Sequence, residues 1–487
     1  MRNFSLVLKR AVKNKILQYI FSKYATFFIQ FINSIFIAVY LGPFYLGIWG
    51  FINLILQYFS QINLGISHSV NVIISVKKDN EQYVQKVVGT AITMLLGLSF
   101  AVIILFIIKE LFDFNLGDKY NFSNYALVVT IISIIGYFNT LFNYVFRVYG
   151  RTTEIAINQS VFPVLILVII PFFRTENLLW ALILVNLIAI LISFSFFLYK
   201  SPLHIKPVWD KPLMKFIQKR GWHLFIYNTS FYLIIVSTKS FVSMYYKVEE
   251  FGFFTFAFSL ANSVLSLLNA ISYLIYPKIL NRFAISNNNK NFLLLSKLRD
   301  TYVTSSHLFI HLSLLFFPVF LLFFPEYEKS AGAFGLIALT VGLYSNSFGY
   351  AGLLIAKGKE KKLSTYSFLA LILNLILAYI LITKLQLPFS QVVFATMLSY
   401  ALYVFFLTWE GRKLIGVKTS LKNVIKDVYP TRLVLPFLTS VTLIILSVPS
   451  IYFILPIGIF VLMNYKSLVS IKKYILEILN NPKIMDI

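Results

Sequence analysis

The sequence predicts an all-α, polytopic membrane protein with about fourteen transmembrane helices, arranged as two parallel six-helix lobes and two C-terminal helices. Three observations lead to this prediction: apolar runs along the whole chain, basic residues gathered on one side, and an internal repeat. Of the 487 residues, 59% are hydrophobic and 13% are charged, and the mean hydropathy is +0.80. Soluble globular proteins do not have this composition.

Apolar runs long enough to cross a membrane recur from end to end. About 20 apolar residues cross a hydrocarbon core of roughly 30 Å as a helix. The first run is too long for a signal peptide and does not end in a small-residue cleavage site, so we expect an uncleaved span. We expect spans at roughly 16–40, 47–74, 88–108, 123–146, 155–173, 178–199, 222–245, 252–276, 301–324, 331–356, 364–383, 388–409, 433–447 and 449–465.

The loops and the composition exclude several classes of protein. The longest loop expected on the outer side covers residues 109–122, which leaves no room there for a soluble catalytic domain. The sequence contains no cysteine, which excludes disulfides, thiolate catalysis and cysteine-bound metals. We therefore expect no catalytic residue, no metal and no cofactor.

Lysine and arginine are concentrated on one side of the expected membrane. The loops of that side, together with both termini, carry 36 of the 43 Lys and Arg residues, and the loops of the other side carry six. Cytoplasmic loops are rich in Lys and Arg, so we expect both termini in the cytoplasm. The net charge of +25 is then explained by loop Lys and Arg residues that set the topology and face anionic lipid headgroups. We expect no nucleic-acid partner.

Two pairs of short motifs recur at a nearly constant offset. The hairpin around Gly47 corresponds to the hairpin around Gly252, and the turn at Gly150 corresponds to the turn at Gly358. Parallel repeats of this kind build many transporters, which bind substrate between the halves. We therefore expect an N-terminal lobe at 1–199, a cytoplasmic amphipathic linker at 200–221, a C-terminal lobe at 222–409, and the last two spans with a cytoplasmic tail at 410–487.

Polar side chains follow a spacing of three to four residues along three of the expected spans, so they form a stripe on one helix face. The stripes contain Ser22, Thr26, Gln30 and Asn33 in the first span, Gln57, Gln61, Leu64, His68 and Asn71 in the second, and Ser259, Asn262, Ser266, Asn269 and either Ser272 or Tyr273 in the eighth.

The stripes have two interpretations. Hydrogen bonds between neighbouring helices would each contribute about 1 kcal/mol, and a wet central cavity between the lobes would place the same side chains on a substrate. The second and eighth spans are related by the repeat, which favours the cavity. The expected substrate-cavity residues are Lys239, His68, Gln57, Gln61, Asn262, Ser266, Asn269, Gln30 and Asn33.

A few basic side chains fall within or at the ends of spans. Lys239 lies inside the seventh span, and it either lines the cavity or extends outward to the membrane surface. Lys23 and Arg147 lie near inner helix ends, and we treat them as candidate cations at the cytoplasmic entrance. His307 and His311 have a spacing that can bind a metal, but nothing nearby completes a ligand set.

Acidic residues are confined to the expected loops. None of the 18 Asp and Glu residues falls within the spans. Exporters of cationic drugs generally rely on membrane-embedded carboxylates. The expected cavity therefore suits an anionic group such as a phosphate or pyrophosphate.

The first hairpin carries the most specific motif in the chain. Its turn reads Tyr40-Leu-Gly42-Pro43-Phe-Tyr-Leu-Gly47, followed by Gln57 and by Leu-Gly-Ile-Ser in the second span. The two glycines permit tight backbone geometry and Pro43 fixes φ, so we expect a structural turn. This stretch resembles the polysaccharide-type flippases for O-antigen and capsule repeat units, within the multidrug/oligosaccharidyl-lipid/polysaccharide exporter superfamily.

The resemblance implies a flippase in a bacterial cytoplasmic (inner) membrane. Its substrate would be an oligosaccharide linked to undecaprenyl pyrophosphate, moved from the cytoplasmic to the outer leaflet by alternating access. Its partners would be this lipid-linked oligosaccharide, the membrane lipids, and a polysaccharide polymerase or assembly machinery. In the family, cationic residues in the cavity are thought to meet the pyrophosphate or acidic sugars.

Three other functions remain open from the sequence. The lipid II flippase of cell-wall synthesis is a close relative of the resembled family, and the small number of cations in the spans disfavours it. A multidrug or small-molecule antiporter of the same superfamily fits the topology but not the lack of carboxylates in the spans. A membrane polysaccharide polymerase also has many spans, but such enzymes typically place catalytic residues on a large outer loop.

Overall fold

The computed structural model describes residues 15–63, 65–77, 79–112, 117–203, 206–263, 283 and 288–480, and these residues are helical apart from short connections. They divide into two compact units. Unit 1 extends to Thr229 and includes Lys247–Gly252, and unit 2 contains Ser230–Tyr246 and the residues from Phe253 onward. The fold is all-α, as predicted.

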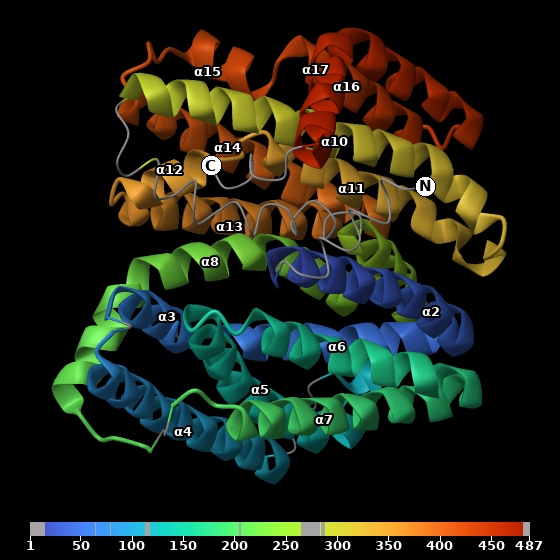
Figure 1. Cartoon of the computed structure of the whole chain (residues 1–487). Helices are drawn as coiled ribbons and strands as arrows, with labels where there is room; N and C mark the ends of the chain where they lie inside the picture. Colours follow the sequence, from blue (N-terminus) through green and yellow to red (C-terminus); the bar gives the residue numbers. More distant parts are fainter. Residues whose placement is uncertain are drawn as a thin grey trace. The chain divides into compact units, whose positions relative to one another are not determined.

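Unit 1 is a bundle of long apolar helices, drawn in blue to green in Figure 1. Its core includes the contact of α3, α4 and α5 around valine and isoleucine side chains that are fully buried, among them Val70, Val84, Val88 and Val145. The helices are α2 (Lys15–Gln61), α3 (Ile66–Lys77), α4 (Glu81–Leu111), η1 (Asp118–Tyr120), α5 (Ser123–Val148), α6 (Thr152–Ile169), η2 (Ile170–Phe172), α7 (Thr175–Tyr199) and the first part of α8 (Lys211–Tyr245).

Unit 2 contains the end of α8, the described part of the eighth span at 253–263, and the helices drawn in yellow to red in Figure 1. These helices are α10 (Asn288–Leu321), η3 (Pro325–Ser330), α11 (Ala331–Ser345), α12 (Tyr350–Ala356), α13 (Glu360–Thr383), η4 (Phe389–Val392), α14 (Val393–Leu414), α15 (Leu421–Val428), α16 (Thr431–Ile445), η5 (Ser450–Phe453) and α17 (Ile454–Asn480).

Many of the described helices can cross a membrane. Nine of them are long and apolar enough, and eleven qualify if each of two bent helix pairs counts as one span. One of the nine is α2, which the backbone at Gly42 divides into two predicted spans. The protein is therefore a multi-pass membrane protein.

The two halves of the sequence repeat the same turn. Gly150 and Gly358 both have a φ of +68°, which favours glycine. The residue after each donates its amide to a carbonyl five residues back, from Arg151 to Phe146 at 2.9 Å and from Lys359 to Leu354 at 2.8 Å. Two helix ends that are 208 residues apart thus close in the same way, as the internal repeat predicts.

The second span differs from the prediction of one continuous helix over 47–74. Helix α2 ends at Gln61 and α3 begins at Ile66, with Gly65 at a φ of +70° between them. The side chain of Asn63 accepts a hydrogen bond from the Gly65 amide at 3.0 Å. Asn and Gly together favour such a turn. The polar stripe of this span is therefore divided between two helices, and Leu64 lies outside the described residues.

The structure also differs from the prediction of a separate surface linker at 200–221. Residues from Lys211 onward belong to α8, which continues without a break to Tyr245. The preceding residues are fixed on α4, because the Val208 amide donates to Gly89 O at 3.1 Å and Lys86 forms an ion pair with Asp210 at 2.7 Å. The helix that carries the expected seventh span therefore begins before the apolar run itself, in a basic segment.

Candidate functional site

The polar stripe of the first span is used in contacts with α6. Thr26 Oγ1 lies 2.8 Å from Ser160 Oγ, and Asn33 donates to the carbonyl of Pro163 at 2.7 Å. Lys23 donates to the side chain of Gln159. For these three residues the hydrogen-bond interpretation applies, because each meets a polar group of a neighbouring helix.

Gln30 belongs to the same stripe but has a different environment. Its side chain is exposed on the protein surface, whereas Asn33 is 3% exposed. The stripe is therefore not uniform. Gln30 is available to a ligand or to solvent, and Asn33 holds α2 against α6.

A second group of predicted residues comes together in unit 1. The ring of His68 on α3 packs edge-on against Tyr144 on α5, with 6.1 Å between the ring centroids. Arg147 lies one turn after Tyr144 on α5. It is close enough to His68 for an electrostatic interaction between the two side chains. The structure thus brings the predicted cavity residue His68 and the predicted entrance cation Arg147 together in unit 1.

The glutamines of this stripe lie at the end of α2. Gln57 and Gln61 are both partly buried. Gln61 accepts a hydrogen bond from Thr229 at 3.5 Å. These two amides lie on α2 and His68 lies beyond the break at Gly65, so backbone geometry in the turn sets their relative positions.

Lys239 is buried within unit 2 rather than extended to an exposed surface. Its side chain is 2% exposed, and its Nζ lies 4.5 Å from the centroid of the Phe258 ring. Asn262 is one turn after Phe258 on the same helical segment. The lysine therefore faces the helix that carries the third polar stripe. Ser266, Asn269, Ser272 and Tyr273 lie outside the described residues.

A buried polar cluster beside Lys239 was not predicted from the sequence. Asn374 on α13 donates to Ile234 O and to Ser237 Oγ on α8, both at 2.8 Å. The hydroxyls of Thr238 and Thr396 lie 2.6 Å apart. Asn374 is the signal that the sequence offers, because an amide inside an otherwise apolar span is costly without partners.

The predicted turn residues make two close backbone contacts. Gly42 has a φ of +70° and precedes Pro43, where α2 bends. A Cβ atom on Gly252 would lie 1.9 Å from Pro43 O, and one on Gly47 would lie 2.2 Å from Val248 O. The segment Lys247–Gly252, which belongs to unit 1, thus packs on the first hairpin, and each side contributes a glycine at the contact.

The two histidines of α10 have separate polar partners. His307 Nε2 lies 3.0 Å from Asn346 Oδ1, and His311 Nδ1 lies 3.3 Å from Ser440 Oγ. Both side chains are at most 2% exposed. In the described residues they connect α10 to the chain after α11 and to α16.

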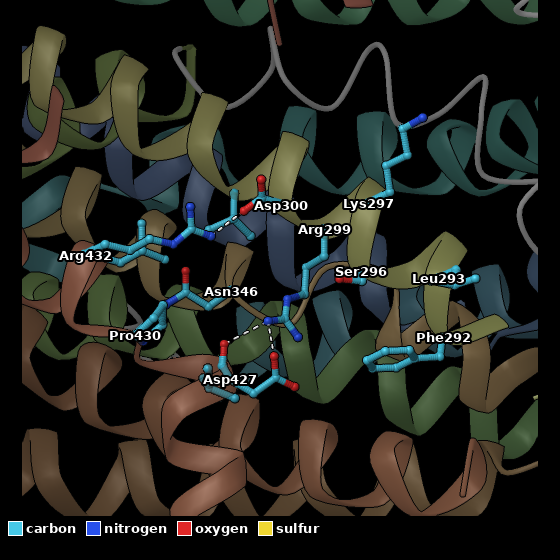
Figure 2. A pocket seen from close by; sticks show the side chains of 13 residues that line it. Phe292, Leu293, Ser296, Lys297, Arg299, Asp300, Asn346, Asp427, Pro430 and Arg432 are labelled. Atoms are coloured by element: carbon cyan, nitrogen blue, oxygen red, sulfur yellow. Dashed lines mark hydrogen bonds and ion pairs between the residues drawn. The ribbon is translucent and has the colours of Figure 1, made fainter. Parts of the chain in front are cut away.

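A pocket of about 530 Å³ opens at one end of α10, within unit 2 (Figure 2). Two arginines border it: Arg299 donates to Asp427, and Arg432 donates to Asp300. The residues that line it are Phe292, Leu293, Ser296, Lys297, Arg299, Asp300, Val303, Asn346, Asp427, Val428, Pro430, Arg432 and Leu433.

The acidic residues of this end lie within longer helices than predicted. Asp300 belongs to α10 and Glu410 to α14, two helices that are long and apolar enough to cross a membrane. Both carboxylates lie at helix ends, just outside the apolar runs expected at 301–324 and 388–409. Each has a basic partner, since Arg432 binds Asp300 and Lys362 binds Glu410. Because helices project beyond the hydrocarbon, charged side chains at their ends keep hydrophilic surroundings.

Comparisons with known proteins agree with this architecture. The protein family described as "Polysaccharide biosynthesis protein" matches residues 122–325. The structure is similar to lipid II flippase MurJ in an inward closed conformation, with a TM-score of 0.69 and 14% identity over 94% of this chain and 100% of that chain. No curated protein matches the chain in sequence.

Two solved structures, each described as a multidrug resistance MATE family transporter of the MOP superfamily, are also similar. The inward-facing one has a TM-score of 0.65 and 16% identity over 80% of this chain and 94% of that chain. The outward-facing one has a TM-score of 0.54 and 14% identity over 84% of this chain and 95% of that chain. At these identities the likeness concerns the fold. Together with the family match, it confirms the resemblance inferred from the first hairpin.

Proposed function

We propose that this chain, a multi-pass membrane protein with the fold shared by MOP superfamily transporters and flippases, is a flippase for lipid-linked oligosaccharides. The substrate class is an oligosaccharide on undecaprenyl pyrophosphate, carried from the cytoplasmic to the outer leaflet of a bacterial cytoplasmic membrane. The match of residues 122–325 to a polysaccharide biosynthesis family carries this proposal. The similarity to a lipid II flippase supports a lipid-linked substrate.

The proposed mechanism needs a polar path for the headgroup and no chemical step. Alternating access would expose the path first to one leaflet and then to the other. Arg147 in unit 1 and Lys239 in unit 2 are the cations we assign to the pyrophosphate, and the imidazole of His68, which packs near Arg147, would hydrogen-bond the substrate. Gln30, Gln57, Gln61 and Asn262 would hydrogen-bond the sugars.

The charge balance of the described spans supports an anionic substrate. Lys239 lies over the ring of Phe258, which is a neutral group. The carboxylates of Asp300, Glu410 and Asp427 are bound to arginine or lysine at helix ends. The buried part of unit 2 around Lys239 therefore presents positive charge to a ligand.

An accumulation experiment tests this function. The protein is depleted, and undecaprenyl-pyrophosphate oligosaccharide is probed with a glycosidase or lectin that reaches only the outer face. Accumulation of protected, inward-facing units is the expected result. Outward-facing, unpolymerised units would assign the chain to polymerisation, and an unchanged pool would contradict a lipid-linked substrate.

The second candidate is a multidrug or small-molecule antiporter, which the similarity to MATE transporters favours. Deletion distinguishes the two functions. Loss of a surface glycan supports the flippase, whereas increased sensitivity to cationic drugs with an intact glycan supports the antiporter. We place both termini in the cytoplasm and expect a polysaccharide polymerase or assembly machinery as partner of the flippase.

A further inference from the structure

The pocket at the end of α10 combines an apolar side with a charged side. Phe292, Leu293, Val303 and Leu433 contribute apolar surface, and Arg299 and Arg432 contribute guanidinium groups. Its volume of about 530 Å³ is within the range of roughly 300–1,000 Å³ that holds small ligands. A site with both surfaces suits an amphiphile whose headgroup is charged.

The charge of the cluster is positive. Among its described residues, Arg299, Arg412, Arg432 and Lys297 are basic, while Asp300 and Asp427 are acidic. Asp427 is shared between Arg299 and Arg412, and Tyr350 also donates to it at 2.8 Å. Two positive charges therefore exceed the carboxylates in a partly buried place, which favours an anion.

The guanidinium groups are fixed before any ligand arrives. Arg432 donates to Asp300, Asn464 and Ser467, which uses three of the five hydrogen bonds that an arginine can donate. Asn346 lies between Arg432 and Arg299 in the view of Figure 2. Arginines held in this way recognise phosphate oxygens with little loss of side-chain entropy.

The neighbouring helix α15 indicates the depth of the pocket. It is amphipathic: Val424 and Val428 are buried, Leu421 and Ile425 are exposed, and Lys422 and Lys426 lie among them. A basic helix with exposed apolar side chains lies at the boundary of headgroups and acyl chains. The axis of α15 is bent by 64° from that of α16, an apolar helix of 15 residues. The pocket is thus at the level of lipid phosphates.

We propose that this pocket binds the phosphate headgroup of a lipid, with Arg432 and Arg299 on the phosphate and the apolar wall along the first part of the lipid. The lipid is either an anionic phospholipid of the leaflet or the lipid pyrophosphate that the protein transports. The proposal goes beyond the proposed function and does not require it, since a phospholipid could occupy the site whatever the cargo.

Native mass spectrometry of the full-length protein, with phosphatidylglycerol or phosphatidylcholine added, measures this binding. Wild type should retain phosphatidylglycerol preferentially. The double variant R432Q/D300N removes a guanidinium without leaving its carboxylate alone, and S296W fills the pocket without a change of charge. The double variant should weaken retention roughly tenfold, as expected for the loss of about one charge-assisted hydrogen bond. S296W should weaken it at least as much, because the indole occupies the space of the headgroup.

Two control variants separate the pocket from general attraction. K422Q/K426Q removes two charges from α15, and S470W places the same bulky side chain on an exposed face of α17. Both should bind phosphatidylglycerol as wild type does, and all variants should elute as folded protein. If the pocket variants fold and bind normally, or if only K422Q/K426Q loses binding, the proposal is wrong.

Competition identifies the source of the headgroup. Undecaprenyl pyrophosphate is added to protein loaded with phosphatidylglycerol. Displacement in wild type would show that the carrier lipid can occupy the pocket, and retention would assign the pocket to leaflet phospholipid. Both results support a lipid-phosphate site, and neither depends on whether transport of the oligosaccharide has been demonstrated.

Discussion

The buried lysine of α8 and the basic residues at the helix ends of unit 2 are held by different partners. Lys239 lies over the Phe258 ring. At the ends of helices in unit 2, Arg299 binds Asp427 and Lys362 binds Glu410. A neutral partner leaves the charge of a cation in place, whereas a carboxylate cancels it. Deep cations should therefore affect transport, and helix-end cations should affect stability.

Asp427→Ala should have the largest effect. It would leave Arg299 and Arg412 without their shared carboxylate in a site where both are at most 17% exposed. Breaking a buried pair by removing one partner costs several kcal/mol, and we expect a loss of about 3 kcal/mol here. Thermal unfolding in detergent measures it, with Lys422→Ala on the same helix as control. An unchanged unfolding temperature would show that the pairs do not hold α15.

The pH dependence of this contribution follows from the same contacts. Burial alone would raise the pKa of Asp427, but hydrogen bonds from Arg299, Tyr350 and Arg412 outweigh it and lower the pKa below the ordinary value of 3.8. The stabilisation is therefore complete above pH 3.8 and is lost as the pH falls through the lower value of the folded state. Asp427→Asn should not show this loss.

Lys239→Ala should reduce transport about tenfold, the loss expected when one charge-assisted hydrogen bond to a phosphate is removed. The amount of protein in the membrane should not fall, because a buried lysine is costly to insert. The measurement is appearance of lipid-linked oligosaccharide on the outer face, normalised to protein. Lys239→Arg should retain part of the activity. Normal transport by the alanine variant would remove Lys239 from the substrate site.

His68→Asn and Arg147→Gln should each reduce transport by a few-fold, less than the change at Lys239. The two side chains act on each other through the contact of α3 with α5. If both meet the same anionic group, the double variant should lose less than the product of the single effects. Independent effects would indicate that the residues serve different parts of the substrate.

Arg151→Gln should have the smallest effect. Its ion pair with Glu154 is 3.1 Å long, and the arginine side chain is 47% exposed. Exposed pairs of this kind contribute between nothing and about 1 kcal/mol, so we expect a loss of about 0.3 kcal/mol. A loss comparable to that of Asp427→Ala would contradict the view that burial decides the strength of the helix-end pairs.

Features set by periodicity and by backbone chemistry were predictable from the sequence. The apolar runs give the helices, and the offset between Gly47 and Gly252 relates the two segments that pack together. Gly150 and Gly358 close their helices with the same φ. Each of these features depends on the preferences of a few residues close together in the sequence, so the sequence alone predicts it.

The pocket and the buried amide cluster were not predictable in the same way. The pocket residues Arg299, Asp427 and Arg432 include two that are more than 100 positions from the first. From the sequence, both arginines are counted only among the basic residues that set the membrane topology. Their contacts depend on how α10, α15 and α16 pack. The break before Gly65 was also missed, because a spacing of three to four residues continues across it, although Asn63 and Gly65 are themselves turn residues.

The contact between Gly47 and Gly252 also concerns synthesis. Unit 1 includes Lys247–Gly252, so the first bundle lacks one of its own pieces until the ribosome has added some two hundred further residues. At roughly 5–20 residues per second this takes on the order of 10–40 s. During that interval the surface of the first hairpin at Gly47 is not yet covered by Lys247–Gly252. An insertion chaperone that shields such a surface would have its longest opportunity here, and a chain truncated after the sixth span would present the same surface permanently.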